Sequence, residues 1–264
     1  MPEPDYAADT ALLEEAVCRG GAIARTFLTG RNKIRSKADG SPVSEADLAV
    51  DRFLKERLRP ARPEYAWLSE ETEDDSTRLA ARRIFVVDPI DETIAFLKGK
   101  PHFTICAAVV ESGVPVAAAV YNPLTEECFT ALRGAGARLN GSLIRVSSRE
   151  KLDGCRMLAS KATLRDACWG GAPWPPMETA TPNSIAYRIA LVACGAFDAA
   201  ITLAGTHDWD LAAADLIIRE AGGLVSSFEG VSPHYNQTNP IHPSIVAAGR
   251  RLQEAILSRV VRKD

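Results

Sequence analysis

The segment from Arg83 to Thr93 constrains this chain more than any other. Its first part, residues 83–87 (RIFVV), is apolar and β-branched, which predicts a strand. Two carboxylates, Asp88 and Asp91, follow directly, and Pro89 between them interrupts strand hydrogen bonding. Buried acids are costly without a positive partner, and hard divalent cations prefer carboxylate and carbonyl oxygens as ligands. The segment therefore predicts a metal site at the end of a hydrophobic strand.

The last residues of this segment predict a second property. Asp91, Glu92 and Thr93 open what we expect to be a short helix from Thr93 to Lys98. The start of a helix offers free backbone N–H groups to an anion. Metal-binding carboxylates beside an anion-binding turn indicate phosphate chemistry.

Composition limits the class of protein. The chain has 264 residues, of which 46% are hydrophobic and 25% charged, and a formal net charge of -3. This length supports one large domain or two fused lobes. The slightly acidic balance argues against a nucleic-acid polymer or an anionic membrane as partner. Because no run of 18 apolar residues and no basic, apolar leader is present, we expect a cytoplasmic protein with six reduced cysteines.

The order of patterns along the chain predicts two sub-lobes that meet near residue 150. Helices are expected at about 8–30 and from Ser44 to about 59, and residues 39–42 have the composition of a turn. Short turns then separate four strands at 102–110, 114–121, 128–132 and 137–146, which favours an antiparallel sheet. Beyond Leu152, helices are expected at 184–194 and 209–221 and strands at 197–203 and 245–248, with a loop or lobe junction at 170–182.

Three other acids have patterns that resemble the opening segment. Glu70 ends the apolar stretch Trp67 to Ser69, although it could also belong to a solvated acidic loop. Asp47 fits a capping box with Ser44 and could be only a helix cap. Asp210 lies in the first turn of a helix, where any carboxylate is favourable, and Asp208 could be its N-cap. Each pattern alone is weak, but their joint occurrence points to one acidic site.

Four motifs together resemble the inositol monophosphatase superfamily. Residues 88–93 (DPIDET) are similar to its D-P-[IL]-D-G-T signature, and residues 209–213 (WDLAA) with 220–223 (EAGG) to its second signature. Residues 69–71 (SEE) and 40–47 (GSPVSEAD) match two earlier motifs in the same order. The resemblance covers roughly residues 8–260 and leans toward the CysQ-like branch, which dephosphorylates adenosine 3′,5′-bisphosphate.

The resemblance implies an α+β fold, a layered αβαβα sandwich with a mostly antiparallel N-terminal sheet and a smaller mixed C-terminal sheet. It further implies a single phosphatase domain over residues 1–264, usually a homodimer, that hydrolyses a small-molecule phosphate ester with two or three Mg²⁺ ions. The implied metal ligands are Glu70, Asp88, the carbonyl of Ile90, Asp91 and Asp210.

The resemblance also implies roles outside the metal ligands. The implied catalytic residues are Asp47, Thr93 and Glu70. Asp47 and Thr93 would activate the attacking water, with no phospho-enzyme formed, and Glu70 would help to hold a loosely bound third ion. The backbone of Asp91, Glu92 and Thr93 would bind the phosphate. The implied substrate contacts are Ser184, Asp210 and Lys37, although Lys37 could equally contact the acids or be a surface lysine.

Three positions depart from the family pattern. Glu92 replaces the glycine of the phosphate-binding turn, and it would repel the anion unless its side chain points outward from the first helical turn. Leu203 stands six residues before Trp209, where inositol-specific members often carry an acid. Asn183 precedes Ser184 where a glycine is more usual. Two hypotheses follow: an active Mg²⁺-dependent phosphomonoesterase, for a 3′-phosphonucleotide or an inositol or sugar phosphate, and a catalytically impaired relative that binds metal or ligand in a regulatory role.

Overall fold

The structure is a computed structural model that describes residues 5–28, 34–37, 40 and 42–261. Its longer helices are α1 (Tyr6–Phe27), α2 (Glu45–Leu58), α5 (Ile185–Ala193), α6 (Asp208–Glu220) and α7 (Arg250–Leu257). The short helices are α3 (Thr93–Leu97) and α4 (Lys161–Arg165), with 3₁₀ turns η1 (Ser76–Ala80) and η2 (Ala167–Trp169). The end expected for the first helix near residue 30, and residues 39 and 41 of the turn expected at 39–42, lie outside the described residues.

A seven-stranded sheet forms the N-terminal half, in the order β3-β4-β5-β6-β7-β8-β9. Its strands are β3 (Ala66–Ser69), β4 (Arg83–Asp91), β5 (Thr104–Glu111), β6 (Val114–Asn122), β7 (Glu127–Leu132), β8 (Gly136–Leu139) and β9 (Ser142–Leu143). Only β3 and β4 pair in parallel; every other neighbouring pair is antiparallel. This confirms the mostly antiparallel sheet predicted from the short turns.

A five-stranded mixed sheet forms the C-terminal half, in the order β11-β10-β12-β16-β14. Its strands are β10 (Arg156–Leu158), β11 (Glu178–Ala180), β12 (Ala199–Thr202), β14 (Gly223–Ser226) and β16 (Ile245–Gly249). Two small ribbons complete the strands, β1 (Ile34–Ser36) with β2 (Pro42–Ser44), and β13 (Thr206–His207) with β15 (Ile241–His242).

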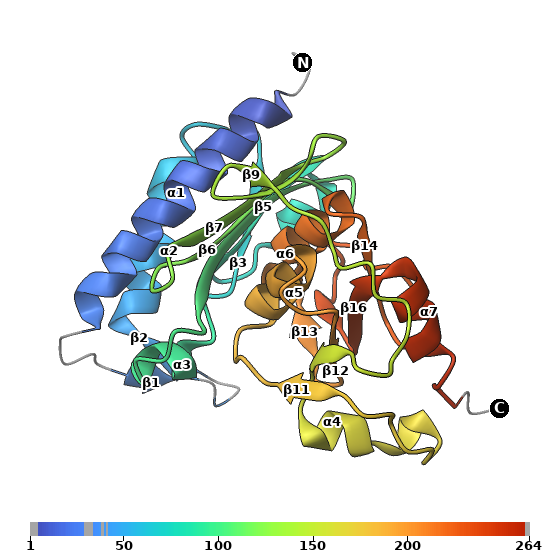
Figure 1. Ribbon diagram of the computed structural model, residues 1–264. Helices are drawn as coiled ribbons and strands as arrows, with labels where there is room; N and C mark the ends of the chain where they lie inside the picture. The colour runs from blue at the N-terminus through green and yellow to red at the C-terminus, as the bar shows by residue number, and fades with distance from the viewer. Residues whose placement is uncertain (1–4, 29–33, 38–39, 41, 262–264) are drawn as a thin grey trace.

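The elements stack in five layers (Figure 1). Helices α1 and α2 cover one face of the seven-stranded sheet, α5 and α6 lie between the two sheets, and α7 covers the outer face of the smaller sheet. This arrangement confirms the predicted αβαβα sandwich. Whether the chain acts as one domain with two sub-lobes stays a prediction.

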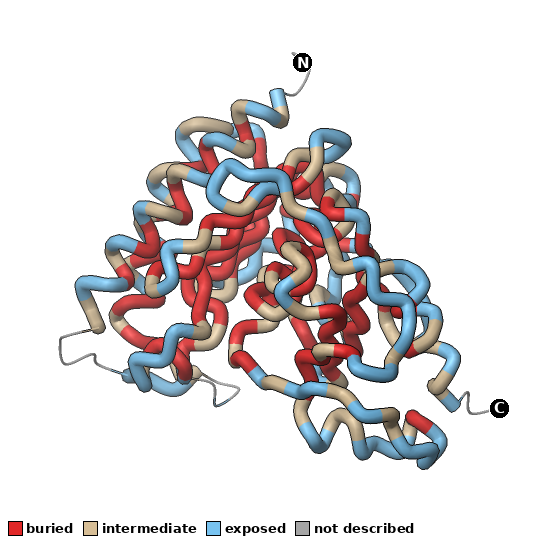
Figure 2. Tube along the Cα trace, viewed as in Figure 1, coloured by how far each residue is buried: buried red, intermediate tan, exposed pale blue. Residues whose placement is uncertain are grey.

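Strand β4 is buried along its whole length, and the strands of the larger sheet are mostly buried (red in Figure 2). Successive strand residues point to opposite faces, so Phe85 and Val87 pack with the α1/α2 cluster while Ile84 and Val86 pack with the central α5/α6 cluster. The apolar pattern at 83–87 therefore predicted this strand correctly, and its burial carries the acids at its end into the interior.

Three local predictions were wrong. The strand expected at 137–146 is divided into β8 and β9, because Asn140 (φ 47°) and Gly141 (φ 80°) form a two-residue hairpin turn. The loop expected at 170–182 contains β11, which pairs in parallel with β10. His207, not Asp208, is the N-cap of α6.

One other feature agrees with its prediction. Ser44 caps α2 in a reciprocal box with Asp47, as predicted. The six cysteines are free thiols, and none of the described helices is long and apolar enough to cross a membrane.

Candidate active site

The end of β4 places two acids in the protein interior. The pairing of β4 with β5 is irregular between Asp88 and Asp91, at the position of Pro89. Asp88 is fully buried; its Oδ1 accepts a hydrogen bond from the Ile90 N–H at 2.9 Å, and its Oδ2 has no hydrogen-bond partner among the described residues. A buried carboxylate oxygen without a donor is costly, so it indicates a missing positive ligand.

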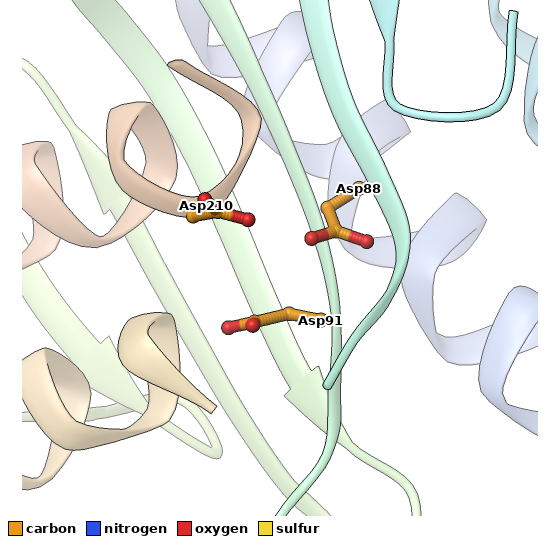
Figure 3. Close-up of side chains that lie close together, drawn as sticks. All are labelled: Asp88, Asp91 and Asp210. Atoms are coloured by element: carbon orange, nitrogen blue, oxygen red, sulfur yellow. The ribbon is translucent and has the colours of Figure 1, made fainter. Parts of the chain in front are cut away.

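A third acid comes from a distant part of the sequence. Asp210 lies in the first turn of α6, where its Oδ2 accepts the His207 N–H at 2.7 Å. Carboxylate oxygens of Asp88, Asp91 and Asp210 all lie within 4.8 Å of one another, and the three side chains converge on one point (Figure 3). The fold thus joins the two signature motifs into one cluster.

The electrostatics of this cluster agree with a cation site. Burial, followed by the nearby acids, raises the pKa of Asp88 well above its usual range. Burial and the charge of Asp210 raise the pKa of Asp91 to about 8. All-oxygen donors with an unsatisfied buried carboxylate fit a hard divalent ion such as Mg²⁺, which would relieve both burial cost and repulsion.

Metal binding should therefore stabilise the protein more at high pH than at low pH. Between about pH 4 and 8 the metal-free fold retains a proton on Asp91 that the unfolded chain has released, so its free energy of unfolding falls as pH rises. At pH 8 fewer of the cluster's carboxylates carry a proton, so Mg²⁺ has fewer protons to displace. We expect saturating Mg²⁺ to raise the melting temperature by about 5–10 °C at pH 8, and by less at pH 6. Scanning calorimetry with and without EDTA measures this; an equal shift at both pH values would contradict it.

Two glutamates border the cluster and share one lysine. Lys37 Nζ lies 2.7 Å from Glu70 Oε1 and 2.6 Å from Glu71 Oε1. Burial raises the pKa of Glu70, and it raises that of Glu71 to about 7. Lys37 is therefore a partner of the acidic site and not a free surface lysine, and Glu70 belongs to the site and not to a solvated loop.

Asp47 and Thr93 form a buried pair next to the cluster. The Thr93 hydroxyl donates to Asp47 Oδ1 at 2.9 Å, while Asp47 Oδ2 accepts from the Ser44 N–H at 2.8 Å and from the Ser44 hydroxyl at 2.5 Å. Both Asp47 oxygens are thus held in place, and burial raises its pKa. Asp47 therefore caps the helix through Oδ2 and fixes the orientation of the Thr93 hydroxyl through Oδ1.

Ser184 lies behind the cluster, not in contact with the cavity. Its hydroxyl donates to Asp91 Oδ2 at 2.5 Å, and the same oxygen of Asp91 accepts the Ala186 N–H at 2.9 Å. Ser184 is fully buried and also caps α5. The expectation that Ser184 touches substrate is therefore not met; its hydroxyl positions Asp91.

Glu92 does not point outward from a helical turn. It precedes α3 in the left-handed conformation (φ 81°, ψ 65°), which is a glycine-favouring region, and it lines the cavity. Its Oε1 accepts from Asn183 Nδ2 at 3.4 Å. Two of the positions that depart from the family pattern are thus in contact with each other.

The acids open into a cavity of about 360 Å³. Leu203, which stands where inositol-specific members often carry an acid, does not line this cavity. Its neighbour Thr202, at the end of β12, does. Sequence reasoning also missed Arg188, although it is the single charged residue of the otherwise apolar helix α5. The other lining residues include Thr206, His207 and Trp209, and the rings of His207 and Trp209 are stacked 4.5 Å apart.

Solved structures and sequence relatives agree with this geometry. The extragenic suppressor protein suhB from Bartonella henselae superposes with a TM-score of 0.83 at 27% identity, covering 97% of this chain and 100% of that one. The Thermotoga maritima IMPase shares the fold, with a TM-score of 0.80 at 24% identity over 96% of each chain.

Among sequence relatives, the "Inositol-1-monophosphatase" of Rhizobium meliloti is 35% identical over 230 residues, 83% of this chain and 85% of the relative. The "Nus factor SuhB" of Xylella fastidiosa is 34% identical over 226 residues, 83% of this chain and 81% of the relative. These names give no support to the CysQ-like branch. The sequence profile of the inositol monophosphatase family matches residues 5–264, and the chain belongs to that family.

Proposed function

We propose that this protein hydrolyses a phosphomonoester in a Mg²⁺-dependent reaction. The observation that carries the proposal is the convergence of Asp88, Asp91 and Asp210 around an unsatisfied buried carboxylate oxygen. The family and the name of the Rhizobium meliloti relative support phosphatase chemistry.

The chain offers ligands for at least two ions. Glu70, Asp88 and the Ile90 carbonyl would hold one Mg²⁺, and Asp88, Asp91 and Asp210 a second; Glu70 would help to hold a third. Lys37 is ion-paired with Glu70, so its ammonium group and the first ion would share this carboxylate. Bound Mg²⁺ would supply charge that polarises the phosphate and lowers the pKa of a water.

The remaining residues would orient the reactants. The Thr93 hydroxyl, fixed by Asp47, would accept a hydrogen bond from the attacking water, and Asp47 would take up its proton through Thr93. The backbone of residues 91–93 would bind the phosphate beside the cavity. Asp210, which lines the cavity from α6, would hold the leaving-group side of the substrate and assist proton delivery to the departing oxygen.

The family relatives and the cavity lining favour an inositol or sugar monophosphate as the substrate class. The relatives carry inositol monophosphatase and SuhB names, and Thr202 and Thr206 line the cavity. A 3′-phosphonucleotide remains the competing substrate, and the homodimer stays a prediction.

A phosphate-release assay with a substrate panel tests the proposal. We expect the purified protein to release phosphate from myo-inositol 1-phosphate at least tenfold faster, in kcat/KM, than from adenosine 3′,5′-bisphosphate, and only with Mg²⁺. A preference for the bisphosphate would overturn the substrate class but not the chemistry.

The rival function is regulatory binding by a protein that cannot turn over substrate. Glu92 in the phosphate-binding turn and the name "Nus factor SuhB" of a relative favour it. The same assay separates the two functions: no turnover by the natural protein, with turnover restored by Glu92→Gly, would support the regulatory function.

A further inference from the structure

One wall of the active-site cavity carries polar groups that the proposed mechanism does not use. Glu92, Asn183 and Arg188 all line the cavity, and they come from the turn before α3, the segment before α5 and α5 itself. None of the three belongs to the acidic cluster that would hold metal.

These three residues form a connected chain of hydrogen bonds. Asn183 donates from Nδ2 to Glu92 Oε1 at 3.4 Å, and its backbone carbonyl accepts from Arg188 Nη2 at 3.1 Å. Arg188 Nε donates to the Pro182 carbonyl at 2.5 Å, which fixes the plane of the guanidinium. The wall is therefore positioned by its own contacts.

At each end of this hydrogen-bonded network, one polar side-chain atom has no partner among the described residues. Glu92 Oε2 and Arg188 Nη1 have no hydrogen-bond partner in the described part of the protein, and both side chains border the cavity. A carboxylate accepts hydrogen bonds only, and a guanidinium donates only. A hydroxyl both donates and accepts, so neighbouring hydroxyls of one molecule can satisfy both ends.

The charges on this wall disfavour a second anion on the substrate. Glu92 would repel the reacting phosphate of every substrate alike and a second phosphate in addition, while Arg188 lies near the opposite charges of Asp91 and Glu92. Uncharged hydroxyls incur no such repulsion, and hydrogen bonds to a charged acceptor are stronger than those between neutral groups.

We propose that Glu92, held by Asn183, which Arg188 in turn positions, is a specificity-determining residue that binds hydroxyl groups of the leaving alcohol. It would select polyol or sugar monophosphates over esters with a second anionic group. This inference rests on the proposed phosphomonoesterase function and names its substrate class.

The test compares Glu92→Gln with the natural protein on myo-inositol 1-phosphate and on ethyl phosphate, which has no hydroxyl on its alcohol. The amide keeps the shape but removes the charge. We expect the ratio of kcat/KM for inositol phosphate to that for ethyl phosphate to fall about tenfold or more. On adenosine 3′,5′-bisphosphate, kcat/KM should rise. Asn183→Ala should lower the ratio in the same direction, and the exposed control Glu64→Gln should leave it unchanged.

The outcomes separate this inference from the proposed function. An unchanged ratio in Glu92→Gln, with ethyl phosphate still hydrolysed, would overturn the inference and leave the phosphatase intact. If the natural protein hydrolyses neither ester, the proposed function fails, and titration calorimetry with Mg²⁺ decides the inference. If Glu92→Gln weakens the binding of myo-inositol 1-phosphate about tenfold more than the binding of ethyl phosphate, the hydroxyl-binding wall is supported. If the substitution changes the binding of both esters equally, the inference is overturned.

Discussion

Asp88→Asn is expected to lower kcat/KM for phosphate release by about three powers of ten and, at pH 8, to raise the melting temperature of the metal-free protein. The activity falls because the substitution removes the central charge of the cluster, and metal stabilisation of a phosphoryl transition state is worth several kcal/mol. The metal-free fold gains stability because a fully buried acid, repelled by its neighbours, is replaced by a neutral amide.

These two effects have opposite signs, which separates a metal ligand from a residue that only supports the fold. The amide oxygen introduced by Asp88→Asn can still accept the Ile90 N–H that Asp88 Oδ1 accepts now, so the local turn is retained. The stabilisation by Mg²⁺ should also shrink in the variant. Asp153→Asn, an exposed control, should change neither measurement. Full activity in Asp88→Asn, or a lower melting temperature without metal, would contradict the assignment.

Thr93→Val is expected to lower kcat by about two to three powers of ten, because it removes the hydroxyl that would orient the attacking water. That hydroxyl bonds Asp47 Oδ1 at 2.9 Å, so the valine also leaves one oxygen of a buried carboxylate without its donor. The metal ligands are untouched, and the rise in melting temperature with Mg²⁺ at pH 8 should remain.

Thr93→Ser is the matched variant, since it keeps the hydroxyl and loses only a methyl group. We expect its kcat to stay within about tenfold of the natural protein. Steady-state kinetics with myo-inositol 1-phosphate compares the two variants. If serine and valine reduce kcat equally, Thr93 acts through packing and not through its hydroxyl.

The parts of the fold that sequence predicted best are those governed by local patterns. The apolar stretch at 83–87 predicted a buried strand because both faces of β4 are covered, and Ser44 with Asp47 predicted a cap whose partners are three residues apart. The Asn140–Gly141 turn was equally local, and its two positive φ angles explain why the strand expected at 137–146 is broken.

The parts that sequence could not predict depend on contacts between distant segments. Ser184 was assigned to substrate from its motif, but its hydroxyl meets Asp91, which is 93 positions away. The direction of Glu92 depends on Asn183, 91 positions away, and the pairing of Lys37 with Glu70 depends on how β1 and β3 are placed. Motifs identified which acids belong together, whereas packing decided what each of them contacts.

The most direct test of the central claim is phosphate release by the natural protein from myo-inositol 1-phosphate at pH 8, titrated with Mg²⁺. The account predicts no release in EDTA and a saturable rise with Mg²⁺ that is lost in Asp88→Asn. Release that persists in EDTA, or none at any Mg²⁺ concentration, would contradict it.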